Sequence, residues 1–136
     1  MNRIIMLTAV AIVFATAAFA RADDHPVVAL VKSKVKDPSK PFTLVVTAKV
    51  KEGMGAKFES GFAEAIKFTR KETGNISYQL NRDPDHANQY LVYERWKNVD
   101  APAEHLKSEV ISKLLASLPD MLEGAPDFKI MIAVGE

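Results

Sequence analysis

Cysteine is absent from the 136-residue sequence. An intramolecular disulfide, a thiolate metal site and a cysteine-linked lipid are therefore excluded, and stability must come from a buried core. The three histidines, His25, His86 and His105, lie in separate segments without the spacing of metal ligands. A glycine-rich phosphate loop and a Gly-x-Ser-x-Gly nucleophile elbow are also missing. These absences argue against a metal centre, a nucleotide-binding loop and an α/β-hydrolase.

A surplus of basic residues is lacking too. The chain has 18 Lys and Arg against 17 Asp and Glu. Neutralising the phosphates of a nucleic acid requires many more cations than anions on the binding surface. The balance of charges therefore argues against nucleic acid as the main partner.

The first 22 residues have the layout of a secretory signal peptide. A short basic start is followed by an apolar run at residues 4–20, and then by the small-residue patterns Ala-Phe-Ala and Ala-Arg-Ala. We expect cleavage after Ala20 or Ala22 and a periplasmic or secreted protein with no stable membrane span. An uncleaved anchor is the alternative, because the run reaches the short limit of about 17 residues for a span.

Hydrophobic periodicity predicts one domain at residues 42–136, preceded by an extension and linker at residues 23–41. Residues 27–31 could add an edge strand. The domain is expected to be α+β, with a ferredoxin-like β-α-β-β-α-β order, a four-stranded antiparallel sheet and two helices on one face. Strands are predicted at 42–50, 76–82, 89–96 and 128–134. Helices are predicted at 54–73, stopped by Gly74, and from about 98 or 100, ended by Pro119.

The uncovered face of this sheet is predicted to carry apolar residues such as Val45, Met131 and Ala133, or the complementary set, depending on the register of the strands. A large exposed apolar patch is uncommon on a soluble monomer. We therefore expect a homodimer that packs sheet against sheet about a two-fold axis.

Residues 88–108 hold the most suggestive chemistry. In the strand at 89–96, Glu94 shares a face with Val92 and Trp96, so its carboxylate should be poorly solvated and its pKa easily moved. On one continuous helix His105 would face water. Ser108 could cap a new helix start, however, and a break there would let His105 point inward.

The segment at 74–108 resembles the antibiotic biosynthesis monooxygenase family, the dimeric α+β barrel group that includes quinol monooxygenase-like proteins. The shared features are a Gly before a strand with Tyr-x-Leu, an Arg-Asp-Pro connection, a Glu-x-Trp strand end and a downstream His-Leu-x-Ser. The resemblance extends over about residues 42–134. It implies a pocket between helices and sheet in each protomer.

The resemblance also implies a cofactor-independent monooxygenase that oxidises a small phenolic or quinol-type aromatic molecule with O2. His105 would be the general base, and Glu94 would orient it or hold the substrate hydroxyl. Trp96 and Tyr78 would bind the substrate by stacking and by donating hydrogen bonds. The alternatives are that Trp96 and Tyr78 only fill the core, that Glu94 pairs with an arginine or a helix end, and that His105 lies on the surface.

The chain departs from its relatives at Glu109, where many of them carry a second histidine. Haem degradation is disfavoured because Leu114 and Leu115 stand in the region where such relatives place an axial histidine. Two other functions remain open. One is non-catalytic binding of a small apolar molecule in the cell envelope, and the other is a cofactor-free isomerase.

Overall fold

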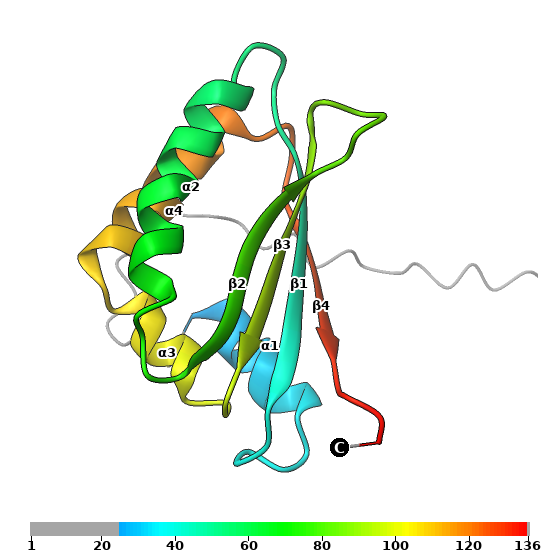
Figure 1. The fold of residues 1–136 in the computed structure, drawn as a ribbon, viewed down its shortest axis with the longest axis vertical. Helices are drawn as coiled ribbons and strands as arrows, with labels where there is room; N and C mark the ends of the chain where they lie inside the picture. Colours follow the sequence, from blue (N-terminus) through cyan, green and yellow to red (C-terminus); the bar gives the residue numbers. More distant parts are fainter. Residues whose placement is uncertain (1–24, 136) are drawn as a thin grey trace, which may run out of the picture.

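The computed structural model describes residues 25–135, so the predicted signal peptide and its cleavage points after Ala20 or Ala22 lie outside the described residues. The elements run in the order α1, β1, α2, β2, β3, α3, α4 and β4 (Figure 1). Their bounds are Pro26–Lys34, Phe42–Lys49, Gly55–Thr69, Asn75–Arg82, Gln89–Trp96, Ala101–Leu106, Glu109–Met121 and Asp127–Met131.

The four strands form one antiparallel sheet in the order β2-β3-β1-β4. Helices α2, α3 and α4 cover one face of it (Figure 1). The alternating apolar residues of the strands point to these helices, and β3 shows the pattern clearly, with Tyr90, Val92, Glu94 and Trp96 all buried. The predicted ferredoxin-like α+β fold is confirmed.

The core fills the space between the sheet and the helices. Helix α2 contributes Phe58 and Phe62, whose ring centroids are 4.7 Å apart, and α4 contributes a buried stripe that includes Leu114 and Leu118. These residues recur at helical spacing, which turns one stripe of each helix toward the strands. Burial of this apolar surface is the main source of stability for a chain without disulfides.

The predicted edge strand at residues 27–31 is wrong, because this segment is helix α1. Val27, Val28 and Val31 fall on one side of a helix and are buried there. Pro26 occupies the first turn, where its missing N–H costs nothing, and His25 Nδ1 accepts a hydrogen bond from the Val27 N–H at 3.2 Å. A short apolar run fits both the two-residue period of a strand and the 3.6-residue period of a helix. The proline in the first turn and the capping histidine favour the helix.

Two predicted helix ends are also corrected. Helix α2 stops at Thr69, before Gly74, and Gly74 has no positive φ. A glycine is needed there because a Cβ atom would lie 2.5 Å from the Cβ of Ala101. Pro119 does not end α4, which continues to Met121 because Leu118 and Met121 are both buried against the core.

Two strand residues differ from the expected alternation. Ile76 lies at a register shift between Asn75 and Ser77 and is 43% exposed instead of facing the core. Strand β4 ends at Met131, so Ile132 lies beyond the sheet and is 52% exposed. In the described part of the chain, the helices are too short or too polar to cross a bilayer.

Candidate functional site

A small cavity of about 90 Å³ lies between the helix-covered face of the sheet and the helices. Most of its lining is apolar, and the polar lining residues are His25, Tyr78, Glu94 and His105. Three of the four predicted site residues, Tyr78, Glu94 and His105, therefore meet at one cavity. Such a partly enclosed, mainly apolar space with a few polar groups is typical of a small-molecule site.

The position of His105 depends on a break between two helices. Ser108 accepts a hydrogen bond from the Ile111 N–H at 3.2 Å and caps α4, while Asn98 accepts from the Ala101 N–H at 3.0 Å before α3. The chain thus changes direction after His105 and does not continue as one helix. His105 is consequently buried, with 5% of its surface exposed, as the predicted break at Ser108 requires.

Glu72 is the partner of His105. The distance between His105 Nδ1 and Glu72 Oε2 is 2.7 Å, and the Glu72 side chain is only 18% exposed. Since a carboxylate accepts hydrogen bonds and cannot donate them, the proton of the neutral imidazole lies on Nδ1. The second ring nitrogen, Nε2, then carries a lone pair, and it has no hydrogen-bond partner within residues 25–135. This arrangement prepares Nε2 to accept a proton.

Trp96 contacts two residues of the cavity lining, Glu94 and His105, without lining the cavity itself. Its indole N–H donates to Glu94 Oε2 at 2.9 Å, and its ring centroid lies 4.9 Å from that of His105. Trp96 is completely buried and is not among the residues that line the cavity. Trp96 thus holds Glu94 and packs against His105. That it also stacks on a ligand stays a prediction.

Burial shifts the acidity of two groups in the cavity. Desolvation raises the pKa of Glu94, while the nearby His105 and the indole hydrogen bond act in the opposite direction. Burial raises the pKa of Tyr78 well above 10.0, and the carboxylates of Glu94 and Glu72 add to this rise. The Tyr78 hydroxyl thus keeps its proton at neutral pH and is available as a hydrogen-bond donor.

Sequence reasoning missed two residues of this site. Glu72 lies in the turn after α2 and meets His105 only through the fold, 33 positions along the chain. His25 belongs to the segment expected to be an extension, yet it lines the cavity. A glutamate in a polar turn carries no local signal that it will form a buried hydrogen bond with a distant histidine. The apolar run after His25 is a signal for packing, although it fits a strand as well as a helix.

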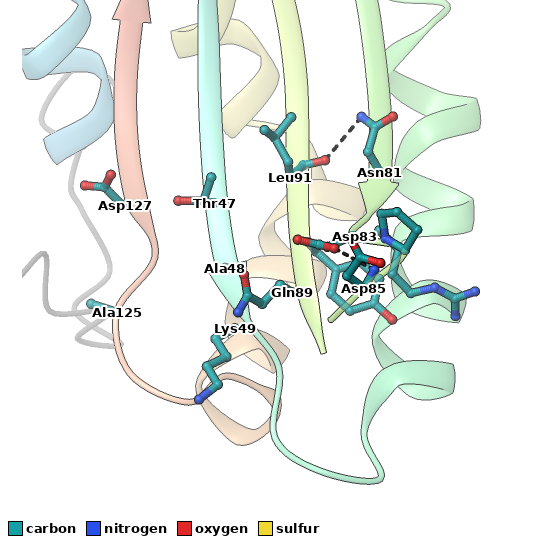
Figure 2. A pocket seen from close by; sticks show the side chains of 13 residues that line it. Thr47, Ala48, Lys49, Asn81, Asp83, Asp85, Gln89, Leu91, Ala125 and Asp127 are labelled. Carbon is teal, nitrogen blue, oxygen red and sulfur yellow. Dashed lines mark hydrogen bonds between the residues drawn. The ribbon is translucent and has the colours of Figure 1, made fainter. Parts of the chain in front are cut away.

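A second hollow, of about 710 Å³, lies at the other side of the sheet (Figure 2). Its lining is more polar and includes Lys49, Asp83, Asp85 and Asp127 but none of the predicted site residues. Asp83 is already occupied, because it accepts hydrogen bonds from the backbone N–H groups of Asp85 and His86. This hollow is larger and more open to water, so the smaller and more apolar cavity is the better place for chemistry that needs water excluded.

Residues 25–135 contain no group of three His, Asp or Glu side chains placed to hold a metal ion. The expectation of a reaction without metal or cofactor remains a prediction.

A sequence model of the antibiotic biosynthesis monooxygenase family matches residues 41–116. An uncharacterized protein of Synechocystis sp. is 28% identical over 96 residues, a match that spans 71% of this chain and 65% of that relative. A solved structure from Caulobacter crescentus, provisionally named an antibiotic biosynthesis monooxygenase, is 28% identical with a TM-score of 0.66, covering 71% of this chain and 92% of its own. A similarly named structure from Nitrosomonas europaea has 16% identity and a TM-score of 0.68, covering 74% of this chain and 97% of its own.

Proposed function

We propose, because the chain belongs to the antibiotic biosynthesis monooxygenase family, that it is a cofactor-independent monooxygenase of a small phenol or quinol. The observation that carries this proposal is the Glu72–His105 pair at a mainly apolar cavity. A phenol becomes a good electron donor to O2 once it has lost its proton. The protein then needs to supply a base, a dry space and donors for the developing oxyanion.

The size of the cavity limits the substrate. An engineered cavity that takes up benzene in another protein measures about 150 Å³, whereas this one measures about 90 Å³. Binding of one aromatic ring therefore requires a lining side chain to move. Leu106 and Leu115 line the cavity and are only half-buried, so they are the side chains best placed to give way.

The first step is proton transfer from the substrate hydroxyl to His105 Nε2. The carboxylate of Glu72 accepts the Nδ1–H and stabilises the imidazolium that forms. Tyr78 remains protonated and can donate to the phenolate oxygen. Glu94 has a raised pKa, and in its protonated form it can hold the same oxygen as a second donor. Glu72 thus takes the orienting role that was one of the two expected for Glu94.

The phenolate then passes one electron to O2, and the radical pair combines to form a carbon–oxygen bond. The peroxide takes the proton from His105. The ring carbon that bears the peroxide then loses its own proton, the electron pair of that C–H bond forms a carbonyl as the O–O bond breaks, and the released hydroxide takes up a proton and leaves as water. For hydroquinone, one molecule of the quinol and one of O2 give one molecule of hydroxybenzoquinone and one of water. The substrate supplies four electrons, one oxygen atom enters the product and the other becomes water.

Oxygen uptake with hydroquinone and substituted quinols tests this function. The purified protein should consume O2 faster than buffer, and His105→Ala should lose about 10²–10⁴-fold in rate, as expected for loss of a general base. His86→Ala is the matched control, because His86 is exposed in the β2–β3 connection. Equal activity of His105→Ala and the unaltered protein would contradict the proposal.

Two other outcomes would favour the alternative functions. Turnover of a carbonyl substrate without oxygen would favour an isomerase. Thermal stabilisation by phenols without turnover would favour a non-catalytic binding protein.

We further propose that the protein is exported after cleavage behind Ala20 or Ala22. The basic start and apolar run of residues 1–22 support this proposal. The mass of the mature protein isolated from its source cells should lack these residues. A full-length mass would contradict cleavage.

A further inference from the structure

Helix α1 contributes to the wall of the cavity although it precedes the part of the chain that matches the family. His25 and Val27 line the cavity together with Pro102 and His105 of α3. The family model matches residues 41–116, and α1 lies before them. The α1 wall, formed by His25 and Val27, is therefore an addition to the part of the chain that the family model matches.

The α1 wall is packed firmly against the rest of the domain. Val31 and Val35 are buried in the same core cluster as Phe42 and Trp96. The segment after the helix is also attached, because the Val99 N–H donates to the Pro38 carbonyl oxygen at 3.1 Å. Side chains fixed in this way limit the shape of a cavity, because protein interiors are close-packed.

The two lining residues of α1 present different chemistry. Val27 offers two methyl groups and is buried, with 7% of its surface exposed. His25 is held by its role as helix cap, in which Nδ1 accepts from the Val27 N–H. Burial lowers the pKa of His25, so this wall adds no positive charge to the cavity at neutral pH. An uncharged aromatic ligand suits such a wall better than an anion.

We propose that α1 sets the size limit of the ligand and that Val27 is a specificity-determining residue that favours one-ring phenols over two-ring ones. The inference rests on the proposed function, in which the cavity takes a phenolic molecule. Val27 is suited to this role because it lies in the lining of a cavity too small for a fused ring system. One methylene in an apolar pocket changes discrimination by about 10–200-fold.

Calorimetric titration of the full-length protein with phenol and with 1-naphthol tests the inference. Val27→Ala should raise the affinity for 1-naphthol relative to phenol by about tenfold or more. Val27→Ile should change the ratio in the opposite direction. Val31→Ala is the matched control, because Val31 is a buried valine of the same helix that does not line the cavity.

Comparison of Val27 with Val31 shows whether an effect comes from the cavity lining or from the packing of the helix in general. If Val27→Ala and Val31→Ala change the ratio equally, or if both Val27 variants leave it unchanged, the inference is overturned. Because the two Val27 variants act in opposite directions, a general loss of stability cannot imitate the expected result. Fluorescence of Trp96, the single tryptophan, reports binding independently of calorimetry. If the unaltered protein binds neither probe, the proposed function and this inference both fail.

Discussion

His105 and Glu72 form a buried pair whose members come from the ends of two different helices. Each residue alone occupies a position that usually faces water. Together they bury a 2.7 Å contact next to a cavity. A largely buried polar pair is weak support for stability, since the loss of hydration offsets much of the gain from its hydrogen bond. The Glu72–His105 contact is better explained by the orientation that it imposes on the imidazole ring.

Glu72→Gln tests this orienting role. An amide can either donate or accept, so the position of the His105 proton is no longer fixed. We expect kcat for quinol oxidation to fall about 10–100-fold, as for losses of residues that orient a functional histidine, with little change in KM. Glu104→Gln, on the exposed side of α3 next to His105, should keep full activity. A variant Glu72→Gln with wild-type kcat would exclude the role.

Glu94 should make the fold sensitive to pH. Its pKa in the folded protein lies above the ordinary 4.5, mainly because it is buried. The folded protein therefore holds this proton more tightly than the unfolded chain does. The Glu94 contribution to stability is largest below pH 4.5 and is lost as pH rises through the raised folded pKa.

Glu94→Gln removes this ionisation and keeps an oxygen that can accept from the Trp96 indole N–H. We expect its Tm to exceed that of the unaltered protein at neutral pH. The difference should shrink as pH falls through the raised folded pKa of Glu94 toward 4.5, and it should stay small below 4.5. Thermal unfolding of both proteins across this range measures the effect. A difference that grows with acid would show that the sign is wrong.

At the scale of elements, the start of β2 and the start of α3 approach each other closely at Gly74. A Cβ atom on Gly74 would meet Ala101 at 2.5 Å, whereas one on Gly61 would lie 3.4 Å from a methyl of Leu114. Gly61 lies inside α2 and is exposed. The two glycines therefore predict opposite effects of the same substitution.

Gly74→Ala should destabilise the protein by about 1–3 kcal/mol, because the two elements must separate. Gly61→Ala should stabilise it by about 0.5–1 kcal/mol through better helix propensity. Urea unfolding of both variants measures these changes. Equal effects of the two substitutions would contradict the packing described here.

The sequence predicts strands better than helix ends, and the reason is visible in particular residues. Strand β3 is predicted at its observed bounds because a run rich in aromatic and branched apolar residues, Tyr90 to Trp96, stands between polar segments on both sides. Helix α1 is missed because its short apolar run fits the period of a strand as well as that of a helix. The cavity can be predicted only in part, since His105 and Glu94 lie near a motif, whereas Glu72 reaches the site only through the chain's turn after α2.

On the scale of the whole molecule, none of the helices within residues 25–135 covers the second face of the sheet (Figure 1). Val45, Leu91 and Tyr93 on this face remain partly exposed, and Met131 is 55% exposed. We propose that two copies associate through this face, because burying apolar surface is favourable.

Light scattering should give twice the chain mass at micromolar concentration. Val45→Lys should give the single mass, because a buried unpaired charge costs several kcal/mol. Lys57→Ala, on the exposed side of α2, is the control and should remain dimeric. A monomeric unaltered protein would contradict the proposed association.

The most direct test is a crystal structure of the protein with hydroquinone bound in the absence of oxygen. The account predicts one ring inside the cavity, with its hydroxyl oxygen within hydrogen-bond distance of His105 Nε2 and with the contact between Glu72 and His105 retained. A ring in the open hollow of Figure 2, or one in the cavity whose hydroxyl points away from His105, would contradict it.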